Sequence, residues 1–339
     1  MINNNNYKSQ LIEGNNIEGL KYILSNLCGK VDLIYLDPPF NTNQVFYYDS
    51  NKIGMVSSKT KTQIAYEDKF NLESYLAFIK ERLLLLKELL SDEGSIYVHI
   101  DTKMSHYLKV LMDDIFGIEN FKNDITRIKC NPKNFNRTAY GNEKDVILFY
   151  AKNGKRNIWN EIKINLNQDE LKKAFKKRDK NGNFYTTIPV HAPSETKKGA
   201  SGSIWRNMFP PIGRHWRYNP NILDKLNAQG KIEWSKNGVL RIIKYANEHK
   251  GKKIQDIWKF KDPQNPKYPT EKNINMIKMI IKQSSREQSY VLDCFSGSGT
   301  TLLAAENTNR KWIGIDNSPI AIKVSMEKLK ESEYDFIQL

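Results

Sequence analysis

Short apolar runs typical of buried strands alternate with segments of helical periodicity at both ends of this chain. The strand-like runs are Val31–Leu36, Ser95–Ile100, Asp145–Tyr150, Tyr290–Cys294 and Lys311–Asp316. The helical segments are Leu72–Leu90, Lys103–Phe116, Ile274–Ser284 and Thr300–Asn307, and a last helix starts at Pro319. Strands separated by helices favour a parallel sheet that is covered on both faces. We therefore expect an α/β fold with a doubly wound, mostly parallel sheet.

The alternation stops in the middle of the chain, from residue 151 to residue 261. This segment is polar and is interrupted by Pro193, Pro210, Pro211, Gly213 and Pro220. Regular periodicity returns after it. The sequence therefore predicts one domain made from both ends of the chain, residues 1–150 and 262–339, with residues 151–261 inserted as a second module.

The middle segment also holds the excess of positive charge. The chain has 53 Lys and Arg against 38 Asp and Glu, a net charge of +15, and residues 151–260 alone have 24 against 9. Five of the six tryptophans lie in the same segment. Cations that displace counterions, together with rings that can stack, are typical of a nucleic-acid surface. A solvated basic face would have a similar composition, but confinement to one segment favours DNA or RNA.

Within this module, Arg206, Arg214, Arg217 and Lys236 are the candidate DNA contacts. Arginine can read guanine edges or grip phosphate, and the sequence leaves both roles open. Trp205 and Trp216 are better placed in the core of the small module than on its surface.

Composition makes several other classes of protein unfavourable. With 39% hydrophobic and 27% charged residues, no apolar run approaches the roughly 20 residues that span a bilayer. Residues 1–10 are polar and lack the apolar core of a secretory signal. Cys28, Cys130 and Cys294 form no C-x-x-C pair, so we expect neither a disulfide framework nor a metal site. A reducing cytoplasm fits this cysteine usage.

The tetrapeptide Asp37-Pro38-Pro39-Phe40 directly follows a predicted strand, where ligands of open α/β sheets bind. An exocyclic base amine is a poor nucleophile, because its lone pair is delocalised into the ring. The Asp37 carboxylate and the Pro38 carbonyl can each accept one amine N–H and favour a tetrahedral nitrogen. The prolines offer no competing N–H, and Phe40 offers a face on which a flipped base can stack. Taken alone, the tetrapeptide also fits an ordinary Asp-Pro turn.

A glycine-rich segment, DCFSGSGT at residues 293–300, lies between a predicted strand and a predicted helix. Gly297 and Gly299 allow a tight turn and the close approach of a ligand. Asp316 ends the next strand, where a carboxylate could bind ribose hydroxyls. Leu302 stands where the dinucleotide-binding fingerprint has its third glycine, which disfavours a nicotinamide dehydrogenase.

The order of these segments resembles that of the beta-class DNA amino-methyltransferases. In that family a catalytic D-P-P-Y/F motif comes first, the target-recognition region follows, and the cofactor motif F-x-G-x-G comes last. Three further segments resemble the family's G-D-N, Y-P-T-Q-K and ribose-binding segments: GNN at 14–16, YPTEK at 268–272 and RKWIGID at 310–316. Asn15 stands where the family usually has Asp, and Asn273 where it usually has Pro. The chain also resembles the modification subunits of restriction–modification systems.

The resemblance implies a Rossmann-like fold that binds S-adenosyl-L-methionine and methylates adenine N6 in double-stranded DNA. The implied catalytic residues are Asp37, Pro38, Pro39 and Phe40. The implied cofactor-binding residues are Asn15, Asp37, Thr270, Lys272, Asp293, Phe295, Gly297, Gly299, Thr300 and Asp316. A companion restriction endonuclease and a second copy of the chain are the other candidate partners.

Three alternatives stay open. Methylation of cytosine N4 needs the same geometry, although Ser rather than Asp usually starts the tetrapeptide. An RNA methyltransferase is disfavoured by the order of the segments and by the large insertion. A DNA-binding protein on a degenerate methyltransferase scaffold should have lost Asp37, Gly297, Gly299 or Asp316, and all four are present. The chain has no Pro-Cys pair, which argues against carbon-5 cytosine methylation.

Overall fold

The computed structural model describes residues 8–41, 44–48, 63–68, 71–131, 138–196, 198–264, 266, 268 and 271–339, with the backbone alone for 44–48 and 63–68. The chain forms two compact units: unit 1 is Met1–Ile162 with Gln255–Leu339, and unit 2 is Lys163–Ile254. Unit 2 is shorter at both ends than the insertion expected at 151–261. The difference arises partly because strand β16 (Ile257–Lys259) pairs with β6 (Phe121–Ile128) in the sheet of unit 1.

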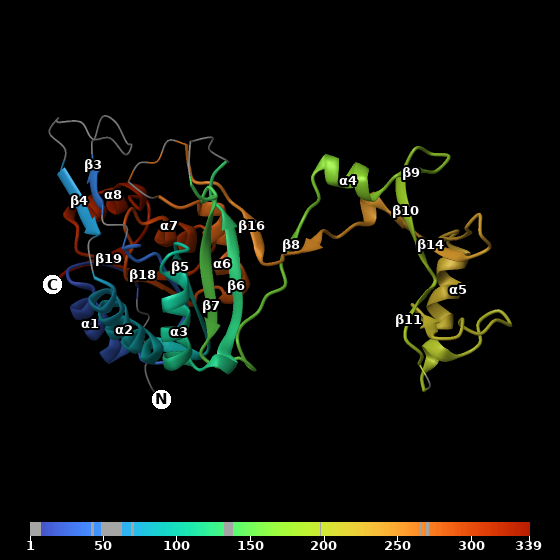
Figure 1. Ribbon diagram of the computed structural model, residues 1–339, viewed down its shortest axis with the longest axis horizontal. Helices are drawn as coiled ribbons and strands as arrows, with labels where there is room; N and C mark the ends of the chain where they lie inside the picture. The colour runs from blue at the N-terminus through green and yellow to red at the C-terminus, as the bar shows by residue number, and fades with distance from the viewer. Residues whose placement is uncertain are drawn as a thin grey trace. The chain divides into compact units, whose positions relative to one another are not determined.

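Unit 1 contains a sheet whose described strands follow the order β16-β6-β7-β5-β2-β17-β18-β1-β19 (Figure 1). The remaining strands are β1 (Ser9–Glu13), β2 (Val31–Leu36), β5 (Leu90–Ile100), β7 (Lys144–Ala151), β17 (Tyr290–Asp293), β18 (Lys311–Asp316) and β19 (Tyr334–Gln338). Strand β7 is antiparallel to both of its neighbours, and every other pairing in this sheet is parallel. The predicted mostly parallel sheet is confirmed. A separate hairpin joins β3 (Gln44–Tyr48) to β4 (Gln63–Asp68).

Helices cover both faces of this sheet. They are α1 (Asn16–Leu27), α2 (Leu72–Leu89), α3 (Ser105–Phe116), α6 (Ile274–Ser284), α7 (Thr300–Glu306) and α8 (Pro319–Lys328), and a 3-10 turn, η1 (Ile118–Asn120), follows α3. Ile34 and Leu36 of β2 belong to the core that contains α1, α2 and α3, which lie side by side in Figure 1. Side chains alternate along a strand, so Tyr97 of β5 faces the other way and contacts Ser284 of α6. None of the described helices is long and apolar enough to cross a membrane.

Unit 2 is small and mostly antiparallel. It contains β8 (Lys163–Ile164), α4 (Gln168–Ala174), β9 (Lys177–Arg178), β10 (Phe184–Pro189), β11 (His191–Pro193), η2 (Ala200–Gly202), β12 (Arg214–Trp216), α5 (Pro220–Ala228), β13 (Ile232–Trp234), β14 (Leu240–Tyr245), η3 (Ala246–Glu248) and β15 (Lys252–Lys253). Its core holds Trp205 and Trp216 with Val190, Leu223 and Ile242, so these two tryptophans are structural, as expected. The unit has 20 Lys and Arg against 7 Asp and Glu.

Candidate active site

The carboxyl ends of β2 and β17 mark the point where the sheet winds in two directions. The chain leaves β2 through α2 toward β5, and it leaves β17 through α7 toward β18 on the other side. Asp37 follows β2, whereas Asp293 and Asp316 end β17 and β18. Since these strands are parallel, the three carboxyl groups lie along one edge of the sheet. Open α/β sheets bind their ligands at such a point.

The turn after β2 presents a carboxylate oxygen that has no hydrogen-bond partner among the residues that the structure describes. Asp37 Oδ2 accepts a hydrogen bond from Lys272 Nζ, but Oδ1 is buried and unpartnered. The Tyr75 hydroxyl of α2 donates to the Pro39 carbonyl over 2.8 Å and holds the turn in place. The Phe40 ring lies 5.2 Å from Lys272 Nζ. A buried acceptor without a donor costs free energy, so its presence at this edge indicates a place for a ligand donor.

The glycine-rich loop after β17 is built around two left-handed residues. Gly297 has φ +49° and donates its N–H to Asp316 Oδ2 over 2.8 Å. Gly299 has φ +72°, and a Cβ there would lie 2.7 Å from Ser325 Oγ of α8. Ser296 Oγ, in the same loop, is buried and has no hydrogen-bond partner in the described part of the chain. The contact with Ser325 therefore requires glycine at position 299, whereas the left-handed backbone at position 297 only favours it. The loop also holds a second open polar atom.

Burial changes the protonation of the two carboxyl groups beside this loop. Burial raises the pKa of Asp293 to about 7, although hydrogen bonds from Thr301 and the Phe295 N–H oppose the rise. Burial also raises the pKa of Asp316, against hydrogen bonds from the backbone N–H groups of Ser318 and Gly297. A ligand that brings hydroxyl donors or a positive charge would stabilise the ionised forms of both groups.

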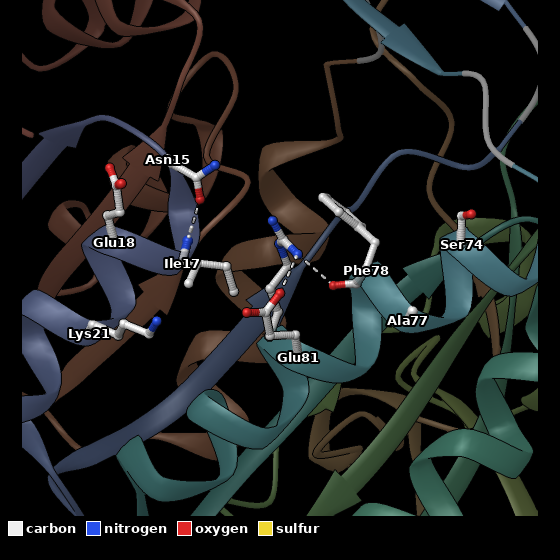
Figure 2. Close-up of a pocket in the computed structure, with 9 residues that line it drawn as sticks. Asn15, Ile17, Glu18, Lys21, Ser74, Ala77, Phe78 and Glu81 are labelled. Atoms are coloured by element: carbon white, nitrogen blue, oxygen red, sulfur yellow. Dashed lines mark hydrogen bonds and ion pairs between the residues drawn. The ribbon is translucent and has the colours of Figure 1, made fainter.

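A pocket of about 640 Å³ opens between the N-terminal halves of α1 and α2. Figure 2 shows Asn15 and Ile17 on one side and Phe78 on the other. The Phe78 ring lies 6.0 Å from the ring of Phe295, so the pocket adjoins the glycine-rich loop. Arg82 also lines it, with its guanidinium carbon 3.5 Å from the centre of the Phe78 ring. The volume is in the range of small-molecule sites.

The two residues that differ from the usual family pattern, Asn15 and Asn273, are both helix N-caps. Asn15 Oδ1 accepts the N–H of Ile17 at the start of α1, and Asn273 Oδ1 accepts the N–H of Asn275 at the start of α6. Asparagine satisfies helix N-termini as well as aspartate does. Asn15 also lines the pocket, so its substitution for Asp keeps both the helix start and a polar group at the site.

Most of the predicted cofactor residues lie near this edge of the sheet: Asn15, Asp37, Lys272, Asp293, Phe295, Gly297, Gly299, Thr300 and Asp316. Thr270 lies outside the described residues. Lys272 contacts Asp37 and Phe40, which ties the YPTEK segment to the predicted catalytic turn. Their roles in binding a cofactor stay predictions.

The four predicted DNA contacts are all exposed on unit 2. Arg214 Nη1 lies 3.2 Å from His191 Nδ1, and burial together with the charges of Arg214 and Arg217 lowers the pKa of His191. Arg206 lies elsewhere, with Nε 3.7 Å from Asp224 Oδ1, and Lys236 lies in the turn between β13 and β14. Arg214 and Arg217 therefore form a local positive cluster.

Several residues of the site carry no motif and were not predicted from sequence. Tyr75 and Arg82 lie on the buried, otherwise apolar face of α2. A polar group at the end of a side chain on such a face is the only sequence signal that could have indicated them. Lys328 Nζ lies 2.9 Å from Ser298 Oγ and 2.5 Å from Glu271 Oε1, joining the glycine-rich loop to the YPTEK segment. These contacts form only in the folded chain.

Comparison with known proteins gives the family. The chain matches the model of the N6/N4 DNA methylase family over residues 31–327. The chain is a member of the DNA methylase family. The chain is 43% identical over 305 residues to the type II methyltransferase M.EcaI of Enterobacter cloacae, a match that covers 88% of this chain and 64% of that protein. It is 26% identical to the Mod subunit of the type III enzyme StyLTI of Salmonella typhimurium, over 92% of this chain and 52% of that one.

The chain thus spans about half to two thirds of the length of these curated relatives. Among solved structures it resembles the cytosine-N4-specific PvuII DNA methyltransferase, with a TM-score of 0.51 and 11% identity over 95% of this chain and 86% of that chain. The DNA modification methylase TTHA0409 of Thermus thermophilus gives a TM-score of 0.50 and 14% identity over 98% and 99%. These likenesses agree with the predicted Rossmann-like fold.

Proposed function

We propose that this methylase transfers a methyl group from S-adenosyl-L-methionine to N6 of adenine in double-stranded DNA. The observation that carries the proposal is the buried, unpartnered Oδ1 of Asp37 at the switch point of the sheet. An amine of the target base can donate one N–H to this oxygen and the other to the Pro38 carbonyl. Phe40 offers its ring to the base.

The residues along the edge of the sheet suit this cofactor. The pocket of about 640 Å³ lies in the size range of small-molecule sites, and Phe78 in its lining and Phe295 beside it supply aromatic surface. Asp316 ends the strand beside the loop, where ribose hydroxyls could replace the N–H of Gly297. When bound, S-adenosylmethionine supplies an electrophilic methyl group on a sulfonium. The chain itself contributes orientation of the amine and a negative field beside the reacting nitrogen.

The assignment to adenine rests on Asp37. Related enzymes that act on cytosine N4 usually start the tetrapeptide with Ser, and the resemblance therefore favours adenine. The name of the PvuII enzyme shows that the same fold also serves cytosine N4. The identity of the methylated base is therefore the first property to measure.

Unit 2 supports DNA as the substrate, because it carries 20 Lys and Arg against 7 Asp and Glu. A basic surface releases counterions from the phosphate backbone and draws the duplex to the enzyme. We assign target recognition to this unit. The relatives are named as parts of type II and type III restriction–modification systems, and we propose the same setting for this enzyme. A companion endonuclease, a homodimer and a cytoplasmic location stay predictions.

The experiment incubates the pure protein with unmodified DNA and radiolabelled S-adenosylmethionine, digests the DNA and separates the nucleosides. We expect the label in N6-methyladenine. Label in N4-methylcytosine would keep the chemistry but overturn the base. No label on several DNAs, with cofactor binding shown by calorimetry, would favour the DNA-binding scaffold instead.

An Asp37→Ala variant tests the role of the open oxygen in the same assay. We expect methylation to fall by at least about a hundredfold, because the amine loses its charged acceptor. Asp335→Ala, at an exposed position of β19, is the matched control and should label DNA at the wild-type rate. If Asp37→Ala labels DNA at the wild-type rate, the proposed role of Asp37 in methyl transfer is wrong.

A further inference from the structure

A buried histidine lies directly behind the open oxygen of Asp37. His99 is at the end of β5, and its side chain is fully buried. The register between β2 and β5 pairs Leu36 with Val98, so Asp37 and His99 follow as neighbours. His99 Nδ1 lies 3.9 Å from Asp37 Oδ1, and the ring centre lies 5.9 Å from that of Phe40. The ring therefore touches the proposed site of the target base.

Two hydrogen bonds fix the ring on its other sides. The Tyr35 hydroxyl of β2 lies 2.8 Å from His99 Nδ1. Asp145 Oδ2 of β7 lies 3.3 Å from His99 Nε2. Asp145 is itself held by Lys129 Nζ at 2.7 Å and by Arg127 Nη1 at 3.4 Å. A chain of contacts thus runs from Arg127 through Asp145 and His99 to Tyr35.

The charges in this chain decide which nitrogen of the ring carries hydrogen. Burial opposes ionisation of Asp145, but the hydrogen bond from His99 and the contact with Lys129 hold its pKa well below the usual range. A carboxylate only accepts, so the hydrogen lies on Nε2 of His99. Burial lowers the pKa of His99, and the ring is neutral. Nδ1 is then bare and accepts the Tyr35 hydroxyl, whose pKa is raised chiefly by burial.

The consequence for Asp37 follows from this tautomer. A bare Nδ1 has no hydrogen to give to Oδ1, even though it lies beside it. Lys272 engages the other carboxylate oxygen, Oδ2. Oδ1 is left buried without a hydrogen-bond partner.

We propose that Tyr35 and His99 are positioning residues for methyl transfer: the Asp145 carboxylate and the Tyr35 hydroxyl together hold His99 in its Nε2–H form, which keeps Oδ1 of Asp37 open for the base amine. This inference rests on the proposed function. The groups that face the ring are Tyr35 and Asp37 from β2, Asp145 from β7 and Lys272, with Arg127 and Lys129 behind Asp145. A protonated ring would place a positive charge beside Asp37 Oδ1 and weaken this oxygen as an acceptor for the base amine. The enzyme must therefore keep His99 neutral in order to work.

The test removes the Tyr35 hydroxyl by the change Tyr35→Phe. The bare Nδ1 then lacks a donor, and the ring lies between the carboxylates of Asp37 at Nδ1 and Asp145 at Nε2, so it takes up a proton at Nδ1 and turns this N–H toward Asp37 Oδ1. The single-turnover methylation rate should fall by about tenfold near pH 6.5 and recover toward the wild-type rate as the pH approaches about 9. KM values for DNA and cofactor should stay within about twofold, since the change affects the acceptor rather than the binding surfaces.

Tyr97→Phe is the matched control. Tyr97 is also a buried tyrosine, but it lies on β5, and its hydroxyl contacts Ser284 Oγ at 2.7 Å, away from Asp37. This variant should keep the shape of the wild-type pH profile. The double variant Tyr35→Phe with His99→Asn carries no ring to titrate, and its rate should be low but independent of pH in this range. The inference fails if the Tyr35 and Tyr97 variants have parallel profiles, or if the acid limb persists in the double variant.

A second measurement needs neither variant nor activity. Nitrogen-15 NMR of the wild-type protein labelled in its five histidines reports which ring nitrogen carries hydrogen. The fully buried ring of His99 should stay neutral and protonated at Nε2 across the pH range. A ring protonated at Nδ1 would overturn the inference even in an active enzyme. If no base is methylated, the proposed function fails by itself, while the tautomer still tests the geometry.

Discussion

Lys272 Nζ donates a hydrogen bond to Asp37 Oδ2, although 235 positions separate the two residues in the sequence. Both side chains are largely shielded from solvent, with exposed fractions of 10% and 18%. Removing one partner of such a pair leaves the other charge poorly solvated, which costs far more than the loss of a surface pair. The contact thus couples the segment after the insertion to the proposed catalytic turn.

The first prediction concerns this pair. Lys272→Ala should lower the free energy of unfolding by about 1–3 kcal/mol and slow methylation by at least about tenfold, because Asp37 loses its cation. Urea unfolding and single-turnover methylation measure the two effects. Lys282→Ala, at an exposed position of the adjacent helix α6, is the control and should match the wild type. Equal behaviour of both variants would show that the contact is incidental.

The second prediction concerns the glycine-rich loop. The backbone at position 299 is left-handed, which strains alanine. The Cβ of alanine would also clash with Ser325 Oγ, at a distance of 2.7 Å. Gly182 has a similar φ of +83°, but a Cβ there meets nothing within 4 Å. Gly182→Ala should therefore cost only the backbone strain, about 1–2 kcal/mol.

Gly299→Ala should destabilise the protein more than Gly182→Ala and weaken S-adenosylmethionine binding by more than about tenfold. Thermal melting and isothermal titration calorimetry measure these quantities. If both variants bind the cofactor with wild-type affinity, the loop is not part of the cofactor site.

The third prediction is a pH dependence set by Asp293. Its pKa of about 7 in the folded chain is above the ordinary value, because the group is buried. Between about pH 4 and about pH 7 the unfolded chain releases this proton and the folded chain keeps it. The free energy of unfolding should therefore fall as the pH rises through this window, by at most about 4 kcal/mol.

Asp293→Asn should remove this decline. Urea unfolding at several pH values, without cofactor, gives the free energy of unfolding of the wild type and of the variant. The contributions of other titrating groups cancel in the difference between these two free energies. Asp335→Asn, at an exposed position, should leave the decline in place. A difference that does not vary with pH would contradict the raised pKa.

The fourth prediction concerns the basic cluster of unit 2. Arg214→Ala should weaken DNA binding and reduce the slope of log affinity against log salt by about one, if this side chain neutralises one phosphate. Fluorescence anisotropy between about 50 and 200 mM salt measures the slope. Arg156→Ala, an arginine of unit 1 that is 61% exposed, is the control. An unchanged slope for Arg214→Ala would place the DNA elsewhere.

The central elements of unit 1 could be predicted because their signals are local. The bounds of α6 and β18 agree with the expected Ile274–Ser284 and Lys311–Asp316. Strands β1 and β19 were missed, because Ser9–Glu13 and Tyr334–Gln338 are short and partly polar. They are strands because β1 pairs with β18 and with β19, which are far away in the sequence. Such long-range pairing leaves no local pattern in the sequence.

The candidate site was predictable where a motif carries it. The tetrapeptide at 37–40 and the loop at 293–300 stand at strand ends, as their spacing indicates. The contacts of His99 with Tyr35 and Asp145 were not predictable, because the three residues lie on different strands and meet through the register of the sheet. Arg127 is likewise buried in β6 by contacts with Asp145 and Asp262, which no local pattern indicates.

Strands β8 and β15 pair Lys163 with Lys253 and Ile164 with Lys252, so the chain enters and leaves unit 2 at neighbouring positions. A segment with adjacent ends can be removed or exchanged without stretching the fold that hosts it, and domain insertions are tolerated for this reason. Exchange of this one contiguous stretch would therefore replace unit 2 while the sheet of unit 1 stays unchanged. A chimaera with its junctions in β8 and β15 is the natural place to begin engineering.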